Sequence, residues 1–213
     1  MKLRVLVLTH QSVEQPGRVK GLWKTERHVI SAIKRLKHET RLLGNVEEVA
    51  AIRTILFEWK PHITFNLMEE FRGEGIYVPY VLGYLQLMRQ PFTGCNPTGL
   101  QLADDKVLAK KLLRYHRIPA PDGVEDRIAK LCKRVYRILG LSGYARMDFR
   151  LTDDGKIFLL EPNPNPDLAR DEDFAESAKA VGIEYDKLIG RVLRLGLQAG
   201  LSGSGERGEG SGT

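Results

Sequence analysis

Tyr144-Ala145-Arg146-Met147-Asp148-Phe149-Arg150 has the residue pattern of a half-buried β-strand. Apolar and polar residues alternate along it with the two-residue period of a strand. Asp154-Gly155, a pair typical of a two-residue hairpin turn, follows shortly after. The apolar run Ile157-Phe158-Leu159-Leu160, followed by Glu161-Pro162-Asn163, predicts the return strand. Together these segments predict an antiparallel β-hairpin.

The register of this hairpin would bring acidic side chains together. With Asp154-Gly155 as the turn, counting outward places Asp148 opposite Glu161 and Arg146 opposite Asn163. Directly opposite residues in such a ladder have Cβ atoms about 4.5–5.5 Å apart. Two carboxylates at that separation repel unless a cation lies between them, and hard cations prefer oxygen ligands. The spacing therefore predicts a magnesium site made by Asp148, Glu161 and Asn163.

The side-chain faces of the return strand bear on this interpretation. A strict period of two puts Phe158 and Leu160 on one face and the other face is formed by Ile157, Leu159, Glu161 and Asn163. Since Glu161 follows an apolar run, we expect it to be buried, where an unpaired charge is costly. A solvated sheet face with an ordinary Asp and Glu is the competing interpretation, which spacing alone leaves open.

The N-terminal half predicts a different kind of sheet. Leu3–Leu8 is an apolar run of the kind typical of a buried parallel strand. Ile63–Leu67 is expected to be another strand, and a shorter strand is expected near Arg41–Leu43. Strands alternating with helical patterns indicate a doubly wound parallel sheet. Ligands bind beyond the carboxyl ends of such strands, here His10–Arg18 and Met68–Gly75. The fold class is therefore α/β.

Local signals place several helices. Asn45 with Glu48 three residues later predicts a capping box for a helix that runs to Trp59. Further helices are expected from Tyr77 to Met88, from about Asp104 to Tyr115, over the amphipathic stretch 124–138, and from about Tyr185 to Leu197. Residues 1–121 form one expected domain and 122–199 a second, followed by a flexible Gly/Ser-rich tail over 200–213.

Composition narrows the functional classes. The chain has 213 residues, 42% of them hydrophobic, a formal net charge of +6 and a pI near 9.3. Its basic residues are scattered along helices with few aromatic residues between them, which does not favour a nucleic-acid partner. Cys95 and Cys132 lack metal-type spacing, so a reducing compartment is expected. The apolar start is too short for a signal peptide or membrane span, and the chain is expected to be cytoplasmic.

Several of these segments resemble one enzyme family. The hairpin residues 144–149 and 161–166, followed by 174–178 and 182–185, look like the C-terminal part of D-alanine–D-alanine ligase-like ATP-grasp enzymes. The first 120 residues resemble that family's N-terminal domain more weakly, chiefly at Pro91–Cys95 and at Asp105-Lys106. The resemblance implies a Rossmann-like pre-ATP-grasp domain followed by the palm part of an ATP-grasp fold.

The resemblance also implies chemistry. Family members join a carboxylate to an amine through an acyl phosphate made with ATP. By this likeness Asp148, Glu161 and Asn163 would hold two Mg²⁺ ions, Arg146 would stabilise the transferring phosphoryl group, and Lys106 would contact a phosphate. The partners would be a small-molecule carboxylate and a small-molecule amine.

The chain departs from the family in one large respect. Intact members carry a whole ATP-clamp domain between the region of Pro119–Pro121 and the helix before Tyr144, where this chain has only Asp122–Asp126. We therefore expect a ligase scaffold that keeps its magnesium palm and lacks its nucleotide clamp, with weak or no ATP turnover. Changes in the expected substrate segments, at Thr9–Glu14 and Met68–Gly75, argue against D-alanine as substrate. The alternative is a non-catalytic scaffold or partner-binding protein, for which a homodimer is one form.

Overall fold

The structure is a computed structural model that describes residues 2–10, 24–44, 46–105, 108–109, 124–152 and 154–202. These residues form two compact units. The first comes from Met1–Gly94 together with Asp167–Thr213, and the second is Cys95–Pro166. The two domains expected from the sequence, residues 1–121 and 122–199, stay a prediction. Each unit is described here by itself.

A parallel three-stranded sheet organises the first unit. Strands β1 (Arg4–Thr9), β2 (Glu39–Leu43) and β3 (Ile63–Leu67) lie in the order β2-β1-β3. Both neighbours run parallel to β1, with Val5 paired to Thr40 on one side and to Ile63 on the other. β1 is buried from Val5 to Thr9 and all of β3 is buried, including the polar residues Thr64 and Asn66, as expected for strands of a parallel sheet that is covered on both faces. The α/β class and the doubly wound parallel sheet are confirmed.

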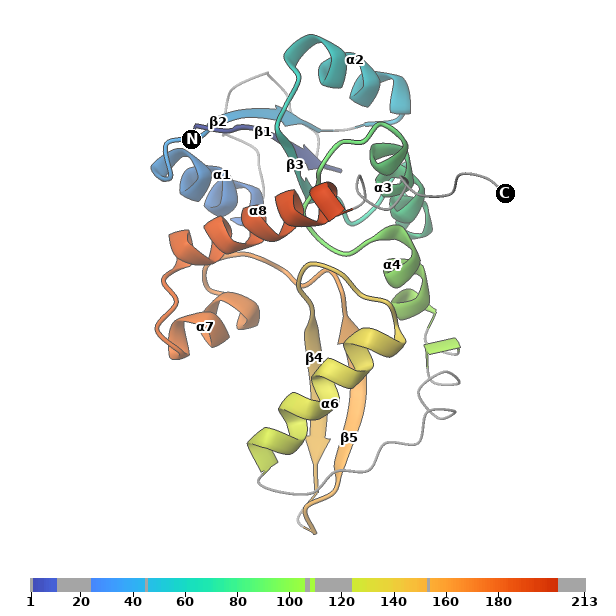
Figure 1. Cartoon of the computed structure of the whole chain (residues 1–213), viewed down its shortest axis with the longest axis vertical. Helices are drawn as coiled ribbons and strands as arrows, with labels where there is room; N and C mark the ends of the chain where they lie inside the picture. Colours follow the sequence, from blue (N-terminus) through green and yellow to red (C-terminus); the bar gives the residue numbers. More distant parts are fainter. Residues whose placement is uncertain are drawn as a thin grey trace, which may run out of the picture. The chain divides into compact units, whose positions relative to one another are not determined.

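Helices cover both faces of this sheet. Figure 1 shows α1 (Lys24–Arg35) and α8 (Tyr185–Ser202) on one side of it and α2 (Val49–Trp59) on the other. The close packing of α8 depends on Gly196. A Cβ there would lie 2.5 Å from the Phe92 carbonyl oxygen and 2.9 Å from Ile63 Cδ1. The unit also contains the 3₁₀ turn η1 (Gly75–Tyr77), α3 (Val78–Leu87) and α7 (Asp173–Ala180).

Some local expectations for this unit need correction. The capping box before α2 is wrong, because Glu48 is itself the N-cap residue and its side chain makes no capping hydrogen bond. Asn45, its expected partner, lies outside the described residues. Helix α8 continues to Ser202, so its last turn includes the first residues of the expected tail, whose remainder at 203–213 also lies outside the described part.

The second unit packs one helix on a two-stranded sheet. Helix α6 (Val124–Ile138) covers one face of the antiparallel pair β4 (Arg146–Leu151) and β5 (Ile157–Asn163) (Figure 1). The core is made by buried residues of α6 and of its flanking segments, among them Leu131, Val135, Leu139 and Leu141. The amphipathic helix over 124–138 is confirmed.

Helix α4 (Pro97–Asp104) precedes the helix that the sequence suggested from about Asp104, and sequence analysis missed it. It begins with a signal visible in the sequence. Pro97 occupies the first turn, and the Asn96 side chain accepts a hydrogen bond of 2.8 Å from the Gly99 amide. Beyond it the structure describes helical backbone only at 108–109, and residues 110–123 lie outside the described part.

Candidate functional site

The hairpin brings the predicted residues together. Asp148 lies directly opposite Glu161, and Arg146 lies opposite Asn163, in an antiparallel ladder. Residues directly opposite each other project from the same face of a sheet, so all four side chains share one face. The predicted pairing of these four residues is confirmed.

The turn that produces this register differs from the expected one. Three residues, not two, separate Thr152 from Lys156. The Thr152 amide donates to the Lys156 carbonyl at 3.0 Å, and the Gly155 amide donates to the Thr152 carbonyl at 2.8 Å. Gly155 has a φ of +76°, the left-handed conformation that ends a three-residue hairpin loop. The two-residue Asp154-Gly155 turn is therefore wrong, and it misplaces the near end of the ladder by one residue.

A β-bulge restores the predicted register. Phe149 pairs with Leu159 and Asp148 with Glu161, so Leu160 has no opposite residue on β4. The extra residue in the loop and the extra residue in the bulge shift the register in opposite directions, so the pairing returns to the predicted one from Asp148 and Glu161 onward. The expected pair of Asp148 and Glu161 was correct because these two deviations cancel.

The bulge also reverses the side-chain faces expected for β5. Ile157 and Leu159 pack against the α6 core, whereas Phe158 and Leu160 are 51% and 57% exposed. The prediction that Ile157, Leu159 and Glu161 share a face is therefore wrong. Glu161 is also exposed, not buried. The burial argument for a metal at Glu161 does not hold, and the case depends on the convergence of charges alone.

Arg146 forms an ion pair with one of the predicted metal ligands, Asp148. Its Nε donates to Asp148 Oδ1 at 3.0 Å and its NH2 group to Asp148 Oδ2 at 3.1 Å. Such a two-pronged ion pair is geometrically specific. The Asp148 carboxylate is therefore compensated in part by its own strand neighbour. Asn163 Oδ1 accepts a hydrogen bond from the Asn165 amide at 2.9 Å, which fixes the side chain and leaves one lone pair of that oxygen.

A further carboxyl group belongs to this acidic region. Asp104, the last residue of α4, is exposed as a whole residue. Even so, partial desolvation of its carboxyl group and then the nearby charge of Glu161 raise the pKa of Asp104 above its ordinary value. Sequence reasoning missed this residue because the contact joins segments far apart in the chain, and nothing in the local pattern around Asp104 indicates it.

The donor set fits a hard divalent cation in chemistry. Two carboxylates and an amide oxygen share one open face, and Asp104 experiences the negative charge of Glu161. Within the described ranges, no group of three His, Cys, Asp or Glu side chains is close enough to bind a metal by itself. Asn163, Asp104 or a ligand would have to complete the coordination. Lys106, the predicted phosphate contact, lies outside the described residues.

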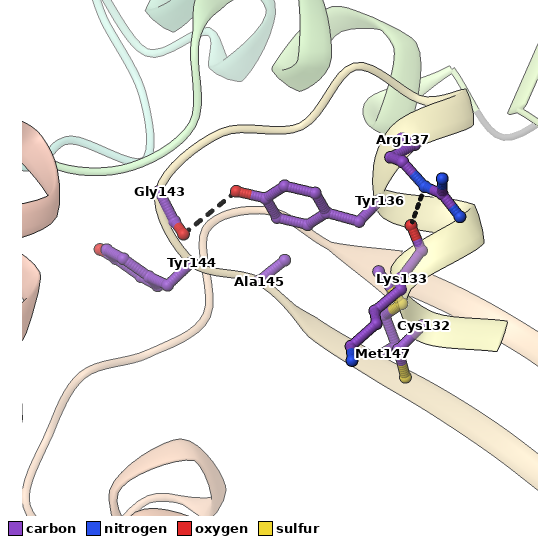
Figure 2. A pocket seen from close by; sticks show the side chains of 8 residues that line it. All are labelled: Cys132, Lys133, Tyr136, Arg137, Gly143, Tyr144, Ala145 and Met147. Atoms are coloured by element: carbon purple, nitrogen blue, oxygen red, sulfur yellow. Dashed lines mark hydrogen bonds between the residues drawn. The ribbon is translucent and has the colours of Figure 1, made fainter. Parts of the chain in front are cut away.

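An apolar groove lies on the other side of the hairpin, against α6. It has a volume of about 660 Å³ and is lined by Cys132, Lys133, Tyr136, Arg137, Gly143, Tyr144, Ala145 and Met147. Figure 2 shows the Tyr136 ring across the groove, with its hydroxyl donating to the Gly143 carbonyl at 3.1 Å. Ala145 and Met147 belong to the face that packs on α6, so this groove is separate from the acidic face. The apolar groove therefore does not contain the predicted metal ligands Asp148, Glu161 and Asn163.

The first unit contains a buried carboxylate that sequence analysis also missed. Glu26 of α1 is 3% exposed and accepts a hydrogen bond of 2.7 Å from the hydroxyl of Thr9, at the carboxyl end of β1. Its second oxygen, Oε2, is buried without a hydrogen-bond partner among the described residues. The helical spacing of Glu26 from Val29, Ile30 and Ile33 is the signal that could have placed it on the buried face.

Comparisons with known proteins agree on the ancestry of the chain. A family model described as "D-ala D-ala ligase C-terminus" matches residues 110–194. The D-alanine–D-alanine ligase of Oleidesulfovibrio alaskensis is 43% identical over 81 residues, which are 38% of this chain and 26% of that ligase. D-alanine–D-alanine ligase B of Chromobacterium violaceum is 29% identical over 155 residues, 70% of this chain and 48% of its own length.

Solved structures show the same fold. A D-alanine–D-alanine ligase from Bacillus anthracis, complexed with ATP, superposes with a TM-score of 0.73 at 17% identity, covering 94% of this chain and 99% of that chain. This chain belongs to the D-alanine–D-alanine ligase-like ATP-grasp family. The matched segments span between about a quarter and a half of the length of the two curated ligases above. Among the described helices, none combines the length and apolar character needed to cross a bilayer.

Proposed function

We propose that this chain is a carboxylate–amine ligase scaffold that retains the magnesium-binding hairpin of its family and lacks the nucleotide clamp. The observation that supports it is the pairing of Asp148 with Glu161, and of Arg146 with Asn163, on one open face. The proposed metal ligands are Asp148, Glu161 and Asn163. The proposed cofactors are Mg²⁺ and ATP, with a small-molecule carboxylate and a small-molecule amine as substrates.

The arrangement of charges suggests how the residues would act. Bound Mg²⁺ would neutralise charge on the phosphate oxygens as the phosphoryl group moves. Arg146 now pairs with Asp148, so a metal that took up the Asp148 carboxylate would free the guanidinium to bind an oxygen of the phosphoryl group. Glu161, which faces both Asp148 and the charge of Asp104, is the proposed bridging ligand.

Weak or absent turnover is expected from the short segment between Ala109 and α6. Only 14 residues, 110–123, separate Ala109 from α6, and a clamp domain does not fit in that length. A clamp orients the triphosphate and excludes water, and such positioning can lower a barrier by about 7–11 kcal/mol. We expect millimolar or weaker affinity for Mg-ATP and little ligation.

Binding of Mn²⁺ alone, measured by electron paramagnetic resonance on the full chain, tests the metal site. We expect Glu161→Gln to weaken Mn²⁺ binding by at least about tenfold, because it removes the ligand with the most convergent charge. Asp154→Asn is the matched control, since Asp154 lies in the same hairpin and pairs with Lys156 instead. Equal Mn²⁺ affinity for the wild type and the Glu161 variant would contradict the site.

Calorimetry with Mg-ATP and an assay of ADP release then test the loss of the clamp. Micromolar affinity together with ligation of amino acids would contradict this part of the proposal. The second candidate function, a non-catalytic partner-binding scaffold, is favoured by the ion pair of Arg146 with Asp148, which compensates a carboxylate without a metal. Absence of Mn²⁺ binding in the wild type would favour it.

A further inference from the structure

The apolar groove between α6 and β4 has no role in the chemistry proposed above. Its volume of about 660 Å³ lies within the range of small-molecule sites, which is about 300–1,000 Å³. Helix α6, residues 143–145 and β4 supply its lining, and all of them belong to the compact unit Cys95–Pro166. The groove is therefore a candidate for a ligand site of its own.

The wall of the groove is largely apolar, and its central ring is held in place. The Tyr136 hydroxyl donates to the Gly143 carbonyl at 3.1 Å, which fixes the ring across the groove (Figure 2). Tyr136, Ala145 and Met147 also pack against the buried core beneath α6. A wall that is already ordered loses little conformational entropy when a ligand enters. The groove therefore suits a compact apolar body.

Two basic side chains of α6 border this apolar wall. Lys133 and Arg137 both line the groove and both are exposed. They lie four residues apart, so they are neighbours on one side of the helix. Neither forms an ion pair with a residue that the structure describes, and the groove-lining residues include no Asp or Glu. The positive charge at the groove is therefore available to a ligand.

The hydrogen bonding of Arg137 indicates which anion fits. Its Nε donates to the Lys133 carbonyl at 3.2 Å, so the two terminal NH2 groups of the guanidinium remain for a ligand. Two N–H groups side by side match the two oxygens of a carboxylate. The Lys133 ammonium adds attraction as a point charge. The rim of the groove therefore favours a carboxylate.

We propose that the apolar groove binds an apolar monocarboxylate, with its hydrocarbon body against Tyr136 and Met147 and its carboxylate at Lys133 and Arg137. A neutral ligand would leave both cations without a partner, and a small polar anion would leave the apolar wall exposed to water. This site is separate from the proposed metal site. Met147 precedes Asp148 in β4, but its side chain lies on the opposite face, toward the α6 core.

Decanoate is the probe, and the methyl NMR signals of the methionines in the full chain report where it binds. Met147 lines the groove, whereas Met68 and Met88 belong to the first unit. We expect the Met147 signal to shift with a Kd on the order of 100 µM, and the signals of Met68 and Met88 to stay in place. No shift at Met147, or equal shifts at all three methionines, would overturn the proposal.

Matched substitutions on α6 test the contribution of the two cations. Arg137→Gln should raise the Kd for decanoate by about fivefold, and the double variant with Lys133→Gln by at least about tenfold. Lys130→Gln is the control, because Lys130 is exposed on the same helix and does not line the groove. Its Kd should stay within about twofold of the wild-type value. Equal losses in Arg137→Gln and Lys130→Gln would show a general effect of charge and contradict the site.

Ligands with the same hydrocarbon chain test the head group in the wild type. Decanol should bind at least about tenfold more weakly than decanoate, because it cannot pair with Lys133 or Arg137. Decylammonium should not displace decanoate. Equal affinities for decanol and decanoate would leave only a greasy surface, and tighter binding of decyl phosphate would replace the carboxylate by a phosphate. Either result is incompatible with the proposal.

Cys132 gives an independent report from the wall of the groove. It is half-buried, whereas Cys95 is 3% exposed. Burial raises the pKa of the Cys132 thiol, so its alkylation by N-ethylmaleimide is measured at alkaline pH. Bound decanoate should slow this alkylation, and the alkylated chain should no longer bind decanoate. An alkylation rate that saturating decanoate leaves unchanged would place the ligand elsewhere and refute the site.

The Glu161→Gln variant separates this proposal from the metal site. Glu161 lies outside the groove, so its substitution should abolish Mn²⁺ binding and leave the Kd for decanoate unchanged. Loss of decanoate binding in Glu161→Gln would mean that the ligand occupies the acidic face, which would overturn the assignment to the groove.

Discussion

The parallel sheet of the first unit and the hairpin of the second differ in how many faces they bury. Strand β3 is buried along its whole length, and β1 is buried from Val5 onward. The hairpin buries only the face toward α6, and on its open face Phe158 and Leu160 are more than half exposed. The first sheet therefore carries the stability of its unit, whereas the open face of the hairpin is free to carry polar chemistry.

Two phenylalanine substitutions, one in each sheet, should differ most in their cost in the free energy of unfolding. Phe65 on β3 is fully buried, and Phe65→Ala should cost about 3–5 kcal/mol in the free energy of unfolding, because it leaves a cavity in a packed sheet. Phe158→Ala on the open face should cost less than about 0.5 kcal/mol. Urea unfolding followed by tryptophan fluorescence measures the change for Phe65, because Trp23 and Trp59 both belong to the first unit.

For Phe158→Ala, hydrogen exchange of the β4–β5 amides gives the corresponding value in the second unit. Equal costs for the two substitutions would contradict the difference in burial between the sheets. A large cost at Phe158 would mean that something covers the open face in solution.

The two sheets also differ in how well the sequence predicted them. Ile63–Leu67 was placed to the residue, although Thr64 and Asn66 interrupt its apolar character. In the hairpin, the period of two failed at Leu160, because a bulge is decided by the packing of β5 on α6 and by the loop at Gly155. The loop type and the bulge each shift the register by one residue, and no local pattern in 152–161 shows that both occur.

A second contrast tests the bulge itself through two adjacent leucines. Leu159 packs against the α6 core, and Leu160 is 57% exposed on β5. Leu159→Ala should therefore cost about 1–2 kcal/mol, less than a fully buried leucine, and Leu160→Ala less than about 0.5 kcal/mol. Hydrogen exchange of the hairpin amides measures both. A β5 strand without the bulge, in which Leu160 faced α6 and Leu159 faced solvent, would give the reverse order of costs.

The candidate site shows the same division between what sequence could and could not predict. The pairing of Asp148 with Glu161 and of Arg146 with Asn163 was predicted correctly because these residues lie on the two strands of one hairpin and because the loop and the bulge shift the register in opposite directions. Asp104 and Glu26 were missed because each depends on contacts formed by the tertiary fold. Glu26 had a signal in its helical spacing from Ile30, but a glutamate in the first turn of a helix is usually a solvated residue.

The smallest expected effect is a pH dependence at the acidic face. Partial desolvation, followed by the charge of Glu161, raises the pKa of Asp104 above its ordinary value of 3.8. Between pH 3.8 and the raised pKa, the folded state binds more protons than the unfolded state, so the free energy of unfolding falls as the pH rises. Above the raised pKa, the loss of stability caused by Asp104 stays constant. Asp104→Asn should therefore stabilise the second unit at pH 7 and have no effect at pH 3, as measured by hydrogen exchange or urea unfolding.

The link between the two carboxyl groups can be measured directly. Glu161→Gln removes the neighbouring charge and should lower the pKa of Asp104, followed by NMR titration of its side-chain carboxyl carbon. Asp154→Asn at the tip of the hairpin is the control and should leave that pKa unchanged. Addition of Mg²⁺ should lower the pKa of Asp104 in the wild type more than in the Glu161 variant, because a bound cation would neutralise the same charge. An Asp104 pKa that responds to neither change would separate Asp104 from the acidic face and leave Asp148, Glu161 and Asn163 as the whole of its oxygen ligand set.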